Sequence, residues 1–206
     1  MEHQPEGIKR AAPEDLKRCF IALKPDSSSI QYLSSLPVPA GWRRTFPEDL
    51  HLTVAFLGGI RPEQAQALHA TLATAPVHLP PMQAQAMELW PSPQRARVFV
   101  LKLKPTRELG ELVEHVTSGL LRLALPLEYR PYRPHVTLAR APHHDNTRAT
   151  WKPAPDAGAA ASVMPSTAGA GADGQLLRFV TLGLFGSVTG PVHGPRYRTI
   201  HAFDLN

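Results

Sequence analysis

Short apolar stretches recur along the chain between polar segments. They are rich in β-branched and aromatic residues, which is typical of β-strands. Gly58-Gly59 directly follows one of them, as expected where a strand ends. The predicted strands are residues 18–23, 51–57, 98–103, 132–140, 176–185 and 197–205.

Three other stretches have apolar residues at steps of three and four, which predicts amphipathic helices. The first follows N-cap candidates at 26–29, the second begins at Pro62 and runs to about residue 75, and the third spans 106–123. The last is the clearest, with Leu109, Leu112, Val113, Val116, Leu120 and Leu123 on one face. The order is roughly β-α-β-α-β-β-α-β-β-β, which predicts an α+β fold with helices covering sheets.

Two segments lack this patterning. Residues 1–16 are polar and contain proline, which predicts a flexible N-terminal segment ahead of a single domain at 17–206. Residues 156–174 consist mostly of Ala, Gly, Ser and Pro, so we expect 141–175 to form a long loop or insert.

The composition limits the class of protein. The 206 residues are 43% apolar, which is enough for a real core in one domain. Cys19 is the single cysteine, so an internal disulfide is excluded. No stretch approaches the length of a membrane span and the N-terminus lacks an apolar signal region, so we expect a cytoplasmic protein without a membrane association.

The positive charge is carried mainly by arginine. The net charge is +5, and 16 of the 22 basic residues are Arg. Arginine presents a planar fork of donors that suits phosphate, so the balance permits a polyanionic partner. A high-GC coding bias, which also favours Arg, Ala and Pro, explains the same composition.

One short motif occurs twice. His51-Leu52-Thr53-Val54 recurs as His135-Val136-Thr137-Leu138, in both places within a predicted strand. Side chains alternate along a strand, so the His and Thr of each copy share one face. Two facing halves of this kind would place two imidazoles and two hydroxyls around one cleft.

These groups suit metal-free cleavage of a phosphodiester. The pKa of a free imidazole is about 6.5, so near neutral pH one ring can accept a proton while the other donates one. Threonine hydroxyls can donate to the non-bridging oxygens of the phosphate. A single His-x-Thr sequence in a strand usually has a structural role. Only its repetition favours a catalytic role.

The two motifs also resemble a known family. HLTVAFLG at 51–58 and RPHVTLAR at 133–140 are similar to the two signatures of the 2H phosphoesterase superfamily, and more narrowly of bacterial and archaeal RNA 2′,3′-cyclic phosphodiesterases, historically called 2′-5′ RNA ligases. Residues 18–22, 185–187 and 194–197 resemble the family's opening and closing strands. The resemblance covers about 16–140 and 176–205, and 141–175 departs from it.

The resemblance implies a bilobal α+β fold, with two pseudo-symmetric lobes whose antiparallel sheets face a central cleft and whose helices lie outside. It implies hydrolysis of RNA 2′,3′-cyclic phosphate ends, or of small cyclic nucleotides, to 2′-phosphomonoesters without a metal or other cofactor. We expect a monomer with no obligate protein partner.

The resemblance also assigns the site. His51, Thr53, His135 and Thr137 fall on the motif positions, and Arg140 matches a basic residue that contacts the phosphate. We assign His135 as general base toward water and His51 as general acid toward the leaving oxygen, although the pseudo-symmetry of the halves leaves this order open. On an ideal strand Arg140 would face away from His135, so its role requires the strand to end or bulge near Ala139.

Two other functions remain open: a 2′,5′-phosphodiesterase or 2′-5′ RNA ligase acting on short oligonucleotides, and a non-catalytic module that binds RNA ends. Further candidates are basic or aromatic residues for RNA, each with an equally ordinary surface or packing role. They are Trp42, Arg95, Arg97, Arg130, Tyr132, Arg133 and Tyr197. The run His143-His144-Asp145 lacks a further ligand at zinc spacing, so no metal site is expected.

Overall fold

The structure is a computed structural model, and it describes residues 16, 18–75, 78–128, 130–142, 174–188 and 194–205. Residues 1–15 of the predicted N-terminal segment, nearly all of the predicted 141–175 insert and the run His143-His144-Asp145 lie outside these residues, whereas Leu16 is described and is buried. The expectations for them therefore stay predictions.

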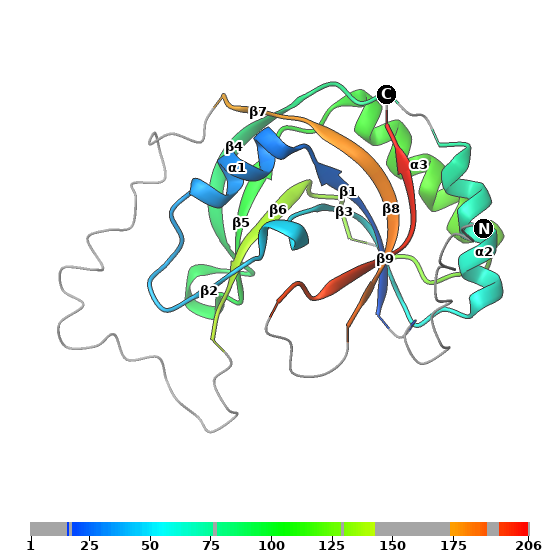
Figure 1. Ribbon diagram of the computed structural model, residues 1–206, viewed down its shortest axis with the longest axis horizontal. Helices are drawn as coiled ribbons and strands as arrows, with labels where there is room; N and C mark the ends of the chain where they lie inside the picture. The colour runs from blue at the N-terminus through cyan, green and yellow to red at the C-terminus, as the bar shows by residue number, and fades with distance from the viewer. Residues whose placement is uncertain are drawn as a thin grey trace, which may run out of the picture.

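The described chain forms a nine-stranded antiparallel sheet with three α-helices, which confirms the α+β class (Figure 1). The strands are β1 (Cys19–Pro25), β2 (Arg43–Arg44), β3 (Leu52–Gly58), β4 (Met82–Trp90), β5 (Val98–Leu103), β6 (His135–Arg140), β7 (Leu176–Leu177), β8 (Phe179–Ser187) and β9 (Tyr197–Asp204). The helices are α1 (Ser27–Ser35), α2 (Pro62–Ala73) and α3 (Arg107–Arg122), and short 3₁₀ turns lie at Pro47–Asp49 and Pro93–Arg95.

The strand order shows how two halves meet. The order is β7-β4-β5-β6-β3-β1-β8-β9, and β2 pairs with β6. The two motif strands, β3 and β6, are neighbours and are joined through one residue pair, Leu52 and Val136. The two halves of the sheet are continuous, and they meet at this narrow joint.

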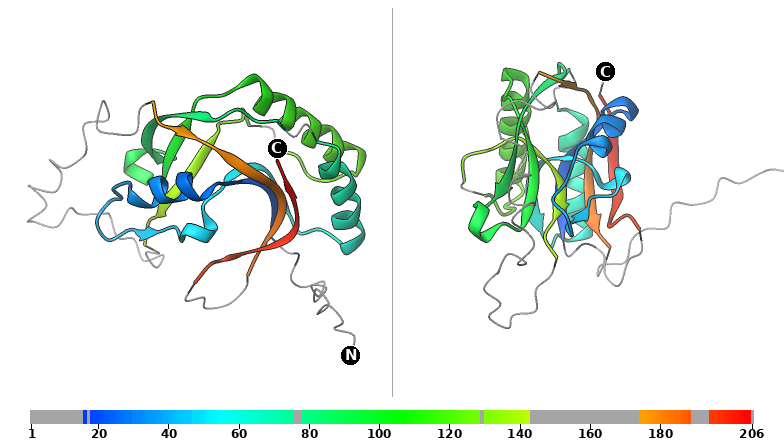
Figure 2. Two further views of the ribbon diagram at one scale, coloured as in Figure 1. Left: turned by 45° about the horizontal axis from the view of Figure 1, so that its top comes forward. Right: turned by 90° about the vertical axis from the view of Figure 1, so that its left-hand side faces the viewer.

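The helices form where the apolar pattern predicted them. In α3, Thr106 caps the N-terminus by accepting a hydrogen bond from the backbone N–H of Leu109 at 3.2 Å. Its buried face includes Leu112, Val116 and Leu120. Helices α2 and α3 lie together on the outer side of the curved sheet, where α2 contacts β8 and α3 contacts β3 (Figures 1 and 2). The face of the sheet that α2 and α3 cover therefore belongs to the hydrophobic core, and the opposite face is available for the site.

Candidate active site

The joint between the two halves brings the repeated motifs together. Because Leu52 pairs with Val136 in antiparallel register, His51 lies opposite Thr137 and Thr53 lies opposite His135. Residues directly opposite on paired strands are close neighbours. Each half thus places its histidine beside the threonine of the other half.

Both imidazoles are held in the same way. The Nδ1 atom of His51 lies 2.5 Å from the carbonyl oxygen of Asp49, and Nδ1 of His135 lies 2.7 Å from that of Arg133. Since a carbonyl oxygen only accepts, each Nδ1 carries the proton and donates. In the neutral ring, Nε2 is then the unprotonated nitrogen that can exchange a proton with a substrate.

His51 lies among aromatic rings. Its ring centroid is 4.8 Å from that of Phe20 and 5.2 Å from that of Tyr197, which meets it edge-on at 89°. Burial, together with the positive charges of Lys24 and Arg140, lowers the pKa of His51 to about 4.

His135 has a different neighbour, the indole of Trp90. The two ring centroids are 4.5 Å apart, and the guanidinium of Arg133 lies 4.1 Å from the centroid of the same indole. Glu88 accepts a hydrogen bond from the indole N–H at 2.7 Å and fixes its orientation. Burial lowers the pKa of His135, and Arg133 and Arg140 contribute in the same direction. Both imidazoles are therefore neutral at neutral pH while no anion is bound.

A pocket opens beside His51 and Thr137. Arg140 also lines it, together with Arg43, Thr45, Phe46, Asp49, Arg196 and Tyr197. His135 and Thr53 lie on the neighbouring positions of the same strands but outside the lining of this pocket. The five predicted site residues are thus on one region of the sheet, and three of them line the pocket.

An irregularity in β6 explains how Arg140 reaches the pocket. In the pairing of β5 with β6, Phe99 lies opposite Ala139 but Val100 lies opposite Thr137. Leu138 is therefore an extra residue on β6, and it reverses the alternation of side chains beyond it. The predicted bulge near Ala139 is present, and the Arg140 guanidinium lies 3.3 Å from the Tyr197 hydroxyl.

Three pocket residues, Asp49, Arg43 and Arg196, were not identified from the sequence. Asp49 is buried, and its carboxylate accepts hydrogen bonds from the backbone N–H groups of Arg196 at 2.7 Å and Tyr197 at 3.1 Å. Arg43 belongs to a two-residue strand without apolar residues. An acidic residue two places before a motif histidine was the one local signal for Asp49.

The other sequence candidates lie elsewhere or act locally, except for Tyr197 beside His51 and Arg133 beside His135. Tyr132 donates to the backbone oxygen of Thr53 at 2.9 Å and so supports the first motif strand. Arg130 forms an exposed ion pair with Glu128, and Trp42 packs against the core. Arg95 and Arg97 do not line the pocket.

Two kinds of feature are missing from the part of the chain that the structure describes. Its residues include no cluster of three or more His, Cys, Asp or Glu side chains able to hold a metal ion. None of its helices has the length and apolar character needed to cross a membrane.

The sequence has known relatives. Residues 27–100 match the family model described as LigT like Phosphoesterase. The chain is 32% identical over 96 residues to the RNA 2′,3′-cyclic phosphodiesterase of Bacillus subtilis and 30% identical over 128 residues to that of Geobacillus stearothermophilus. These matches cover 46% and 59% of this chain but span only 52% and 41% of the two relatives.

Solved structures share the fold over nearly the whole chain. A structure from Thermus thermophilus superposes with a TM-score of 0.65 at 22% identity, covering 91% of this chain and 97% of that one. E. coli LigT complexed with 3′-AMP gives a TM-score of 0.65 at 21% identity and covers 92% of this chain and 98% of that one. The chain therefore carries a LigT-like phosphoesterase match at residues 27–100 and shares the fold of E. coli LigT over 92% of its length.

Proposed function

We propose that this protein hydrolyses RNA 2′,3′-cyclic phosphate ends to 2′-phosphomonoesters by metal-independent acid–base catalysis with two histidines. The observation that carries the proposal is the matched pair of imidazoles, each with Nδ1 held by a carbonyl oxygen so that Nε2 is the atom available to the substrate. The names of the curated relatives support the cyclic phosphate as substrate. The 2′-product follows from the resemblance of the motifs.

The reaction needs one proton removed and one supplied. His135 accepts a proton from water as the water oxygen forms a bond to phosphorus, and His51 donates a proton to O3′ as the P–O3′ bond breaks. Thr53, Thr137 and Arg140 hold the non-bridging oxygens and the charge that develops on them.

Burial lowers the pKa values of both histidines, and that of His51 to about 4, so the ligand-free site holds little of the protonated imidazole that the reaction needs. The order of roles rests on the resemblance of the motifs. A substrate phosphate supplies the negative charge that raises the pKa of both rings and protonates one of them. The two histidines are coupled, and the reactive form holds one proton between them.

The test is the product formed from adenosine 2′,3′-cyclic phosphate, separated as 2′- or 3′-AMP by chromatography. Wild-type protein should give 2′-AMP, and His51→Ala or His135→Ala should each lower kcat/KM at least about 100-fold. His115→Ala is the matched control, because this histidine lies on α3 and bonds to the backbone oxygen of Thr71 at 2.9 Å.

The alternatives are separate outcomes of the same assay. Tight binding of the cyclic nucleotide without turnover would replace the proposal with an RNA-end-binding module. Cleavage of 2′,5′-linked dinucleotides with no opening of the cyclic phosphate would replace it with a 2′,5′-phosphodiesterase. The monomeric state and the cytoplasmic location stay predictions.

A further inference from the structure

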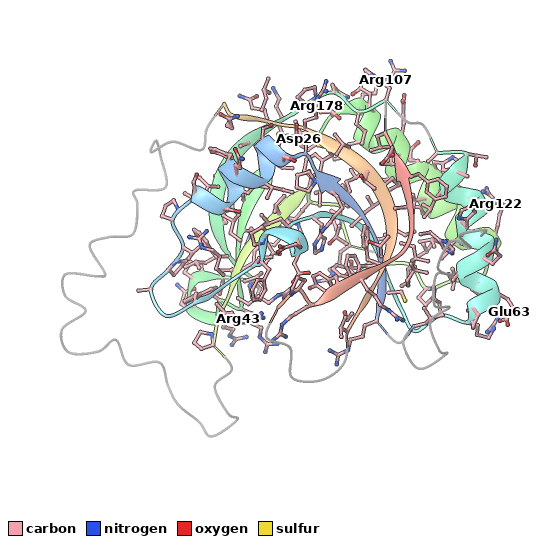
Figure 3. The ribbon with its side chains drawn as sticks, in the orientation of Figure 1. Asp26, Arg43, Glu63, Arg107, Arg122 and Arg178 are labelled. Atoms are coloured by element: carbon pink, nitrogen blue, oxygen red, sulfur yellow. The ribbon has the colours of Figure 1, made fainter. Side chains whose placement is uncertain are left out.

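Three arginines from separate segments surround one part of the pocket. Arg43 comes from β2, Arg140 from the end of β6, and Arg196 from the residue before β9, and all three line the pocket that contains His51 and Thr137. Figure 3 shows Arg43 on the side of the molecule away from Arg122 and the α2–α3 pair. The charge is therefore gathered beside the candidate active site.

This placement opposes the stability of the fold. Arg43 and Arg140 lie directly opposite each other across the paired strands, and like charges in that position destabilise a sheet. The neighbouring Arg44 shows a structural use, since its guanidinium donates to the carbonyl oxygens of Ser34 at 3.0 Å and Leu36 at 2.8 Å. Arg43 makes no such hydrogen bonds with the described residues. A residue that destabilises its local structure without a structural role of its own is typical of a functional site.

Within the described chain, no acidic side chain forms an ion pair with the cluster. The four ion pairs of the described residues involve none of the three arginines. Asp49 is the nearby acid, and both of its oxygens accept backbone N–H groups, which fixes Arg196 and Tyr197 at the pocket. Burial and the charges of Arg196 and Arg140 lower the pKa of the Arg43 guanidinium, and the Asp49 carboxylate offsets only part of this effect. An added anion would relieve this repulsion.

We propose that Arg43 and Arg196 form a second phosphate subsite, which binds the 5′-phosphate of the nucleotide whose cyclic phosphate is opened at the histidines. This inference rests on the proposed function and specifies its substrate. In an RNA strand that ends in a 2′,3′-cyclic phosphate, the next phosphate is attached to the 5′-oxygen of the same ribose. The subsite therefore selects RNA ends over nucleoside cyclic phosphates, and Arg140 lies next to both phosphate positions.

The kinetic test compares three substrates: adenosine 2′,3′-cyclic phosphate, the same compound with a 5′-phosphate, and the dinucleotide ApA with a 2′,3′-cyclic end. The wild-type kcat/KM should be about 10-fold higher for the two substrates with a second phosphate, which is the scale of one charge-assisted contact. An advantage for both supports the subsite and an RNA substrate. An advantage for the 5′-monoester alone supports the subsite but assigns it to free nucleotides.

The variants distinguish binding at the subsite from a general effect of the protein's positive charge. Arg43→Gln and Arg196→Gln should each remove most of the kcat/KM advantage, whereas Arg43→Lys keeps part of it because it retains the charge without the fork. Arg122→Gln, which removes one charge far from the pocket, should retain the full advantage. Equal kcat/KM values for all three substrates in the wild type, or an unchanged ratio in Arg43→Gln and Arg196→Gln, would overturn the inference.

A binding measurement keeps the subsite testable if the proposed reaction fails. By calorimetry, adenosine 2′,5′-bisphosphate should bind about 10-fold more tightly than adenosine 2′-monophosphate, and Arg43→Gln should abolish the difference. The difference should shrink as salt rises, because Arg43 and Arg196 are exposed. Equal affinities would overturn the subsite independently of turnover, whereas a difference in affinity without any turnover would overturn the proposed function alone.

Discussion

At the scale of single residues, the two histidines differ in what surrounds them. His51 contacts Phe20 and Tyr197 and has a pKa of about 4, whereas His135 lies against Trp90 and its pKa is lowered by burial and nearby arginines. In the proposed mechanism the two imidazoles hold one proton between them, so these environments set the pH range of the expected activity.

The pH dependence follows from these directions. Both pKa values lie below the ordinary value of about 6.5, so the singly protonated ligand-free enzyme disappears as pH rises. We expect kcat/KM to be greatest below about pH 6.5 and to fall roughly 10-fold per pH unit above that range. The limbs of kcat should lie at higher pH, because the bound phosphate raises both pKa values.

NMR titration of the ligand-free protein provides the direct measurement, with the midpoint of His51 expected near pH 4. Lys24→Gln should raise that midpoint, since the Lys24 charge contributes to lowering it, whereas Lys104→Gln should leave it in place. Titration of both rings at about 6.5 would contradict the prediction.

The assignment of acid and base predicts a dependence on the leaving group. With a nucleotide 4-nitrophenyl ester, the departing phenolate needs no proton, so loss of the general acid costs little. His51→Ala should therefore recover most of its activity on this ester relative to the cyclic substrate, while His135→Ala should not. Recovery by His135→Ala instead would reverse the two roles.

The sequence predicted the motif residues because each pair is local to one strand. His51 with Thr53, and His135 with Thr137, share a face by the alternation of a strand alone. Asp49, Arg43 and Arg196 were missed because their role depends on pairing between distant segments. The five-residue spacing between His135 and Arg140 indicated that a bulge was needed near Ala139, but only the pairing with the partner strand shows it.

At the scale of elements, the sequence predicted helices and strands best where buried positions recur at a regular spacing. The helical period predicted α3 with its buried face, and the run at 51–57 predicted β3. By contrast, the stretch 176–185 divides into β7 and β8, because the backbone N–H of Arg178 donates to the Ser29 hydroxyl instead of to a strand. No local sequence pattern predicts a hydrogen bond between residues as distant as Arg178 and Ser29.

Helix α3 offers a matched test of its buried face. Leu120 is 1% exposed and the adjacent Leu121 is 62% exposed. Leu120→Ala should lower the free energy of unfolding by about 2–5 kcal/mol through the cavity it leaves, and Leu121→Ala should change it by less than about 0.5 kcal/mol. Urea denaturation of the two variants measures both values, and similar losses would contradict this packing.

The turn at Pro47–Asp49 connects the first motif to β9 through the Asp49 carboxylate. Asp49→Asn replaces one of the two accepting oxygens with an amide donor, so one backbone N–H loses its acceptor and we expect the free energy of unfolding to fall by about 1–3 kcal/mol. Because Arg196 and Tyr197 line the pocket, kcat/KM should also fall about 10-fold, mainly through KM. Glu48→Gln is the control for the lost charge, and an equal kcat/KM for both variants would refute the positioning role.

At the scale of the whole molecule, the site is shared between two halves that meet at Leu52 and Val136. One half provides His51, Thr53 and Tyr197, and the other provides His135, Thr137 and Arg140. The sequence repeat predicted two matching halves. It did not predict that their strands join into one sheet, because the joint consists of a single residue pair.

This shared arrangement predicts that the reaction proceeds without a divalent metal. The acid, the base and the groups that hold the phosphate are all side chains, and the buried acid at the pocket, Asp49, uses both carboxylate oxygens for backbone N–H groups. We expect hydrolysis of adenosine 2′,3′-cyclic phosphate to keep its full rate in excess EDTA, measured with metal-free buffers and dialysed protein. Loss of activity that one divalent ion restores would contradict the prediction, since the ion would then have to supply charge that Arg140 and the threonines are assigned here.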